Sequence, residues 1–431
     1  MQLDILSPLK TAFSILGDYW WLYLPILFGV GSVLGWMNYI THKYRLSLKW
    51  VLLEIKPPPD VQKSPKIAEN IFSGLHASYL PVNNKKRFFK GEIPNYYSLE
   101  IIGNGGDIHF YIRTTEAVRM VVEQQVFAQY PDAEIKIVDD YINLLPHYLP
   151  NDDYDLFGAD LEFTKEDAYP IKTYPFFEEE SGKDEFKRTD PLAPLAETMS
   201  ALEPGEHIWI QILIRPTGNA WVKAAQPAID KLFGKEVPPQ LDFMAKILNG
   251  FASIIVGVLD IFVTAAETKK DEKKEKDINI QKITPGQRFI LEQVENKVAK
   301  LGFKSNVRFL YVSRKEIFHR SHITSVIGMF KQLYANNLNS FTPNRGTMTF
   351  HKGILSKIFP SDKGLFAQQF ESNRKIKFFR HCRERNFNKK VIILNTEELA
   401  TLFHLPGIGL KAPGFPRVEA KKGQPPAGLP M

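Results

Sequence analysis

The sequence predicts an α+β protein in which an N-terminal transmembrane helix precedes two ferredoxin-like (split βαβ) domains, the second interrupted by a helical insertion. Three observations lead to this prediction. Residues 19–40 form an apolar run without a charged side chain. The segments after it alternate between strand and helix patterns in the order β-α-β-β-α-β, which is the ferredoxin-like order. A chain of 431 residues, 44% of them hydrophobic, can also bury the cores of about two to three domains.

Composition excludes several classes of protein. The hydrophobic content rules out a globally disordered chain. Cys382 is the single cysteine, which rules out an intramolecular disulfide and a cysteine-based zinc site. This cysteine usage is typical of a reducing compartment.

The run at residues 19–40 predicts a membrane anchor that follows an N-terminal head, residues 1–18. Its 22 residues would reach across a hydrocarbon core of ~30 Å. We expect its aromatic residues to settle at the two interfaces with the headgroups. These anchor residues are Trp20, Trp21, Trp36 and Tyr39. A signal peptide is the alternative, but the run is long and has no small-x-small cleavage site.

The basic residues around this run predict its orientation. Only Lys10 precedes it, whereas Lys43, Arg45, Lys49 and Lys56 follow it closely. Because cytoplasmic flanks are enriched in Lys and Arg, we expect a single-pass protein of the plasma (inner) membrane with its C-terminal domains in the cytoplasm.

The first ferredoxin-like domain is expected over residues 45–145. A strand pattern stops at three prolines, and the following helix pattern begins with a proline at its first position. The glycines of GNGGD suit a hairpin turn. In order, we expect a strand at 48–55, a helix at 64–75, strands at 97–102 and 108–114, a helix at 115–130 and a strand at 133–141.

The second domain is expected over residues 146–218 and 286–404. VIILN at 391–395 is expected to close its sheet, and Asn395 with Glu398 forms a capping-box pattern that begins the next helix. The earlier elements are strands at 158–164, 207–214 and 306–313 and helices at 190–202 and 315–334.

The helical insertion is expected over residues 219–285. Its apolar part, 247–266, is interrupted by Asn249 and Asp260, and a charge at mid-depth disfavours a second membrane span. The apolar part predicts one of two structures. It is either an amphipathic helix that lies on the membrane or on a partner, or a helical insert that is buried in the domain. Residues 269–277 are expected to be a charged linker, and 405–431 a Pro/Gly-rich tail.

Motifs for catalysis are missing from the sequence. There is no P-loop, no G-x-S-x-G elbow and no H-E-x-x-H helix. His319 and His322 lack a third ligand nearby, and the acidic residues at 152–155 lack the remaining ligands of a calcium loop. We therefore expect no enzyme activity, no cofactor, no metal and no small-molecule substrate.

Charge is distributed unevenly along the chain. Residues 374–390 carry a net charge of +7 and residues 152–186 a net charge of −9, so the two segments are expected to attract each other across a domain or subunit contact. Basic residues interleaved with phenylalanines are compatible with a nucleic-acid or acidic-partner surface. Its candidate residues are Arg374, Lys375, Lys377, Arg380, Arg383, Arg385, Lys389 and Lys390. The interpretation that we favour is an amphipathic helix whose Phe378 and Phe379 face the core, because adjacent phenylalanines before a strand commonly serve packing.

Several segments together carry a family resemblance. They are SLEII, IHFYIRT, AQYPDAEI and VRFLYVSRKEIF, and above all LNTEELATLFHLP at 394–406. The chain resembles the membrane-anchored N-terminal (pre-ATPase) region of bacterial type IV secretion and conjugative DNA-transfer ATPases, the coupling-protein-like, HerA/FtsK-like class. The resemblance covers most of residues 45–431, and the sequence ends at Met431 before any Walker motif.

The resemblance implies a non-catalytic, membrane-anchored scaffold or adaptor that forms homo-oligomers and works with a separately encoded motor ATPase. The tail would meet the motor through Lys411, Arg417, Lys421 and Lys422. A fragment of a longer ATPase fusion is an alternative to a stand-alone subunit. The alternative function is a membrane-tethered nucleic-acid-binding protein that binds DNA through residues 374–390.

Overall fold

The computed structural model describes residues 17–18, 20–57, 64–180, 190–232, 284–349, 365–388 and 390–406. These residues divide into two compact units. The first unit holds the described residues up to Lys49 together with Leu80–Pro94, and the second holds the others. The predicted head, except Gly17 and Asp18, the predicted 247–266 helix, the 269–277 linker and most of the 405–431 tail lie outside the described residues.

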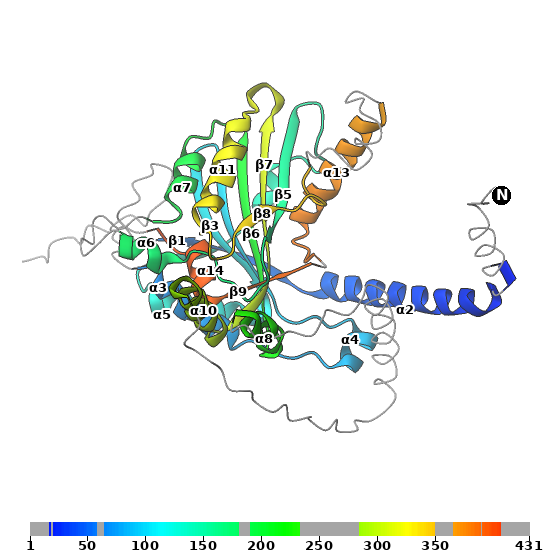
Figure 1. The fold of residues 1–431 in the computed structure, drawn as a ribbon. Helices are drawn as coiled ribbons and strands as arrows, with labels where there is room; N and C mark the ends of the chain where they lie inside the picture. Colours follow the sequence, from blue (N-terminus) through cyan, green and yellow to red (C-terminus); the bar gives the residue numbers. More distant parts are fainter. Residues whose placement is uncertain are drawn as a thin grey trace, which may run out of the picture. The chain divides into compact units, whose positions relative to one another are not determined.

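The described residues of the first unit include α2 (Trp20–Ser47) and α4 (Asn84–Lys90) (Figure 1). Helix α2 contains almost all of the predicted anchor and continues through Lys43 and Arg45. Among the described residues, however, no helix combines the length and the apolarity that crossing a membrane requires. The prediction of a transmembrane helix at 19–40 is therefore not supported. Proline, glycine and polar-tipped aromatic residues dilute the aliphatic side chains of this run.

The first half of the second unit has the predicted β-α-β-β-α-β order. Its strands pair antiparallel in the order β4-β1-β3-β2. Gly105 and Gly106, with φ of 56° and 99°, form the hairpin turn between β2 and β3, as predicted. The elements are β1 (Trp50–Lys56), α3 (Lys66–His76), β2 (Tyr97–Asn104), β3 (Asp107–Thr115), α5 (Arg119–Gln129) and β4 (Glu134–Val138).

The second half repeats this order, with an extra short helix, α6 (Tyr174–Glu180), after its first strand. Its strands run β6-β7-β5-β8, which is the order of the first half read from the opposite end. The repeated elements are β5 (Tyr154–Phe163), α7 (Ala193–Ser200), β6 (Glu206–Pro216), β7 (Gly302–Arg314), α11 (Arg320–Gln332) and β8 (Phe341–Pro343).

One nine-stranded antiparallel sheet contains both halves. They join where β2 pairs with β6, from Tyr97 opposite Ile214 to Asn104 opposite His207. Strand β9 (Ile392–Asn395) joins this sheet, but not in the predicted closing place, which β8 takes beside β5. The reason is that β7 extends beyond β5 at its start, so Gly302–Ser305 has an edge to which β9 binds.

The remaining helices surround this sheet. Helix α8 (Ala220–Leu232) is the described start of the predicted insertion, and α10 (Pro285–Ala299) follows its undescribed part. Helices α13 (Leu365–Arg383) and α14 (Thr396–Leu402) flank β9 in the sequence. Short 3-10 turns occupy Glu116–Val118, Tyr141–Leu144 and Lys315–Ile317.

The two faces of the sheet bury different elements, because successive strand residues point to opposite sides. Leu53 and Ile101 belong to the large core under α3, α5, α7, α11 and α14. Their neighbours Leu52 and Ile102 belong to a second core, which Phe378 and Phe379 of α13 cover. The sheet is therefore a middle layer that positions α13 on one side and α14 on the other.

Candidate functional site

The segment LNTEELATLFHLP forms the end of β9, the whole of α14 and the four residues that follow it. The Asn395 side chain accepts a hydrogen bond from the Glu398 amide at 2.8 Å, and the Glu398 carboxylate accepts one from the Asn395 amide at 2.9 Å. This is the predicted capping box. It fixes the direction in which α14 leaves the sheet.

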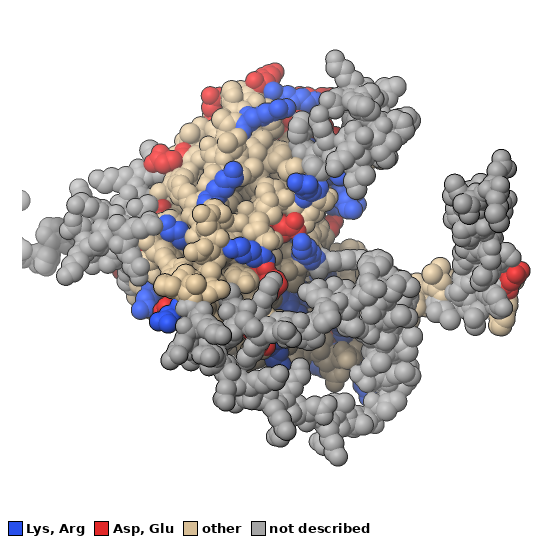
Figure 2. Space-filling model, viewed as in Figure 1, with Lys and Arg blue, Asp and Glu red and all other residues tan. Residues whose placement is uncertain are grey.

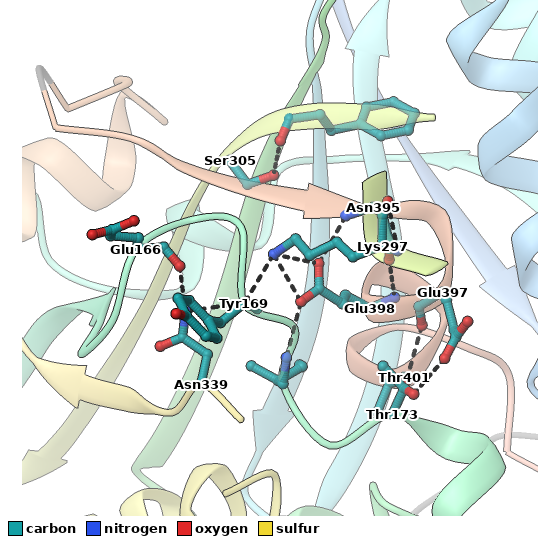
Figure 3. Close-up of polar contacts among 12 residues, drawn as sticks. Glu166, Tyr169, Thr173, Lys297, Ser305, Asn339, Asn395, Glu397, Glu398 and Thr401 are labelled. Carbon is teal, nitrogen blue, oxygen red and sulfur yellow. Dashed lines mark hydrogen bonds and ion pairs between the residues drawn. The ribbon is translucent and has the colours of Figure 1, made fainter. Parts of the chain in front are cut away.

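Glu398 also forms a buried ion pair with Lys297 of α10 (Figure 3). The Lys297 Nζ lies 3.0 Å from Glu398 Oε2, and both side chains are 0% exposed. Lys297 donates a second hydrogen bond to the Tyr169 carbonyl, and Glu398 accepts another from the Ile171 amide. Burial raises the pKa of the Glu398 carboxyl, and Lys297 opposes this shift. The pair is saturated with partners and holds α10 against α14.

A second, partly buried group surrounds Lys300. Its ammonium pairs with Glu69 of α3 at 3.0 Å and with Glu397 of α14 at 2.5 Å. Thr173 also hydrogen-bonds to Glu397. We call this group and the Lys297–Glu398 pair the α10–α14 lock. The lock fastens the chain after the insertion to α3 of the first half and to α14.

An open cleft of about 610 Å³ lies beside the lock. Residues 163–167, 169 and 390–392 line it. Burial raises the pKa of the Asp167 carboxyl in this cleft, although Lys297 and Lys390 lower it. Lys390 pairs with Glu162 at 2.5 Å, and Lys165 donates to the Asn336 carbonyl. The cleft therefore has mixed charge, and its cations are already engaged.

The structure places Arg385, a predicted surface residue, in the interior. It is 1% exposed and forms two hydrogen bonds to Glu100, at 3.0 and 3.1 Å. Two more reach Asp140, at 2.6 and 2.9 Å. Such bidentate pairing is the strongest geometry for a guanidinium. Arg385 therefore holds the end of α13 onto the sheet and is not available to a ligand.

Three further predicted surface cations have partners within the chain. Lys375 pairs with Asp155 at 2.8 Å, and Lys390 pairs with Glu162. These two pairs join the acidic segment 152–186 to the basic segment 374–390, as their charges predicted, within one chain. Arg383 donates a hydrogen bond to the His147 carbonyl at 2.6 Å.

The other predicted cations of this segment have different surroundings. Arg374 is half-buried, and Lys389 lies outside the described residues. Lys377 and Arg380 are exposed and line a second open cleft of about 480 Å³. Phe378 and Phe379 are buried, so the packing interpretation of these phenylalanines is correct. In the view of Figure 2, the Lys and Arg side chains of the described residues are scattered over the surface and form no continuous patch.

Helix α2 has many exposed apolar side chains. Trp20 is 57% and Phe28 78% exposed. We call this feature the apolar helix surface. Its exposed side chains are Trp20, Trp21, Leu24, Leu27, Phe28, Leu34, Trp36, Tyr39 and Leu46, which include all four predicted anchor residues. Exposed apolar surface on this scale marks an interaction site.

Helix α4 was not predicted, although its caps are visible in the sequence. The Asn83 side chain accepts a hydrogen bond from the Lys85 amide, and Gly91 ends the helix with a φ of 67°. Asn before and Gly after a short run are ordinary start and stop signals. Its seven residues were too few for a periodic pattern to be recognised.

The described part of the chain shows no group of three or more His, Cys, Asp or Glu residues that could hold a metal ion. His322 lies 3.6 Å from Glu206, and its ring is 6.2 Å from that of His319. Burial raises the pKa of the Cys382 thiol to about 12. The predicted tail residues Lys411, Arg417, Lys421 and Lys422 lie outside the described residues.

Comparison with known proteins gives a family but no activity. The model of a family described as "Domain of unknown function (DUF8128)" matches residues 43–413. No curated protein matches the chain.

Proposed function

We propose that this chain, which belongs to the family of domains of unknown function DUF8128, is a non-catalytic scaffold or adaptor subunit that attaches to a membrane. The observation that carries the proposal is the apolar helix surface of α2. No Asp, Glu, Lys or Arg occurs from Trp20 to His42. Transfer of such side chains out of water is favourable by about 25 cal/mol for each Å² of apolar surface that is buried.

A lipid bilayer suits this surface because tryptophan and tyrosine occur near both ends of the apolar run. Trp20 and Trp36 are separated by about 24 Å along a helix. Aromatic side chains with a polar tip favour the boundary between hydrocarbon and headgroups. Attachment requires only that the apolar side chains enter this boundary, whether the helix lies along the membrane or inserts more deeply.

The second unit would supply the scaffold. The repeated β-α-β-β-α-β order supports two ferredoxin-like repeats that share a sheet. Buried ion pairs such as Lys297 with Glu398 connect helices from distant parts of the sequence. A second unit that is stabilised by such pairs is suited to binding neighbouring subunits.

The resemblance of LNTEELATLFHLP and its companion segments supports a more specific role. We place the scaffold in a type IV secretion or conjugative DNA-transfer machine at the inner membrane, with its C-terminal domains in the cytoplasm. There it would form a homo-oligomer and work with a separately encoded motor ATPase. Purification from gently solubilised native membranes tests this role. Recovery of a P-loop ATPase would support it, whereas repeated recovery without one would contradict it.

Vesicle flotation of the full chain tests membrane attachment directly. We expect the wild-type protein to float with phosphatidylcholine vesicles and the Leu27→Asp/Phe28→Asp variant to remain at the bottom. Both replaced side chains are exposed, so the fold should survive. Met120→Asp/Tyr148→Asp is the matched control, because these side chains are equally exposed in the second unit. Failure of the wild-type protein to float would contradict the proposal.

Nucleic-acid binding is the second candidate, and it rests on Lys377 and Arg380. Both are exposed beside one cleft of α13, and no ion pair is seen for either among the described residues. Two phosphate contacts would give a salt dependence of DNA binding with a slope near −2 on a double-logarithmic plot, about −0.9 for each contact. Lys377→Glu/Arg380→Glu should remove that slope. Equal DNA binding by the variant would exclude this surface.

A further inference from the structure

We infer that α4, together with the part of α2 on which it packs, binds the headgroups of anionic phospholipids. This inference rests on the proposed attachment of α2 to a membrane and adds a lipid preference to it. The evidence that it adds to the apolar helix surface is the position and the charge of α4.

The backbone geometry fixes α4 against α2. Gly91 approaches the carbonyl of Ile40 so closely that a Cβ atom there would lie 2.3 Å from the carbonyl oxygen. Trp36 of α2 donates a hydrogen bond from Nε1 to the Phe88 carbonyl at 3.0 Å. The ring of Tyr39 lies 6.3 Å from that of Trp36. Helix α4 therefore sits at the end of α2 where aromatic side chains of the headgroup boundary are expected.

The side chains of α4 are basic and exposed. Lys85, Lys86, Arg87 and Lys90 are all exposed, and the helix has no acidic residue. The one ion pair seen for them in the described residues joins Lys86 to Glu92 at 3.7 Å. Phe89 is 58% exposed between these cations. We call these five residues of α4 the basic collar.

Anionic lipid explains this combination better than nucleic acid does. The basic collar is joined to an apolar helix, and Phe89 adds an apolar side chain among the charges. Such a surface can place its apolar groups among acyl chains while its cations pair with phosphates. A nucleic acid would leave the neighbouring apolar side chains of α2 in water.

Binding of the full chain to two kinds of vesicle tests the inference. One kind contains phosphatidylcholine alone, and the other contains equal amounts of phosphatidylcholine and phosphatidylglycerol. We expect the wild-type protein to prefer the mixed vesicles, by about fivefold for each cation that reaches the surface. The preference should weaken as salt is added.

Replacing the four collar cations by glutamine should abolish the preference for mixed vesicles and leave binding to phosphatidylcholine unchanged. Glutamine keeps a high helix propensity, so α4 should persist. The matched control removes four exposed cations of the second unit and should keep the preference. It combines Lys304→Gln, Lys315→Gln, Lys331→Gln and Arg345→Gln.

The outcomes separate this inference from the proposed function. Binding to both kinds of vesicle with equal affinity would contradict headgroup binding by the basic collar and leave the proposed membrane attachment intact. Failure to bind either kind would overturn both. If the collar variant lost DNA binding but kept its preference for phosphatidylglycerol, the collar would be a nucleic-acid surface and the inference would be wrong.

Discussion

Lys297 and Arg385 are buried and fully paired, whereas Lys85, Arg87 and Lys90 of the basic collar are exposed, with no ion pair seen among the described residues. The two groups share a charge and differ in surroundings. A buried cation loses its water and needs carboxylates in return, so it fastens elements of the fold together. An exposed cation keeps its water until a ligand with negative charge arrives. Local charge density in a sequence therefore does not by itself predict a binding surface.

The largest effect should follow from removing one partner of the buried pair. Glu398→Ala leaves Lys297 uncompensated in the interior and should reduce the free energy of unfolding by about 3–5 kcal/mol. Urea denaturation of the full chain measures this loss. Glu116→Ala, at an exposed carboxylate, is the control and should change stability by less than about 0.5 kcal/mol. Equal losses in the two variants would contradict the assigned role of the pair.

The same comparison can be made between two arginines of one segment. Arg385→Ala should cost about 3 kcal/mol or more, because Glu100 is fully buried and loses its guanidinium partner. Arg380→Ala, five residues earlier and exposed, should cost less than about 0.5 kcal/mol. Thermal and urea unfolding measure both values. A small cost for Arg385→Ala would show that Glu100 finds another partner.

Two buried histidines test the cost of placing a positive charge in the interior without a sufficient partner. Burial lowers the pKa of His207 and of His381 from 6.5 to about 4. The unfolded chain therefore takes up protons below pH 6.5 that the folded chain refuses until about pH 4. Stability should fall as pH drops through this window, by about 1.4 kcal/mol per pKa unit for each histidine.

Urea unfolding at several pH values between these limits measures the effect, and His207→Gln should make the dependence shallower. The lowered pKa of Asp140 contributes stability that is lost only below about pH 3.8. The raised pKa values of Asp167 and Glu398 favour the folded state as pH falls and therefore oppose the histidines, so the difference between the wild type and the variant measures the histidine contribution. Equal pH dependence of the two proteins would show that the His207 ring accepts a proton in the folded state.

Apart from the control variants, the smallest effect on stability should come from Gly91→Ala, which tests the position of the basic collar without changing its charge. An alanine at a φ of 67° costs about 1–2 kcal/mol, and its Cβ would also meet the Ile40 carbonyl. We expect α4 to shift from α2 and the preference for anionic vesicles to weaken. An unchanged preference would mean that the collar needs only its charge and not its place on α2.

Much of the sheet could be predicted because its strands and helices have local periodic patterns. The order of β1, α3, β2, β3, α5 and β4 follows from such patterns, and so do the capping box of Asn395 and the turn at GNGGD. Each of these signals depends on residues that are only a few positions apart, so it can be recognised in a single sequence.

The rest depends on contacts between distant residues. Arg385 and Glu100 are 285 positions apart, and nothing near either one indicates the other. The pairing of β2 with β6, which merges two expected domains into one sheet, is also non-local. For the candidate surface at 374–390, the sequence correctly predicted attraction to the acidic segment 152–186. It did not show that the resulting ion pairs form within one chain.

The passage from α2 into the sheet has a mechanical consequence. Only Leu48 and Lys49 separate Ser47, where α2 ends, from Trp50, where β1 begins. Strand β1 is not at the margin of the sheet, because β3 and β4 flank it on either side. In antiparallel pairs the hydrogen bonds lie perpendicular to the strands. A pull on α2 along β1 therefore loads both ladders in shear, and they must rupture together instead of unzipping bond by bond.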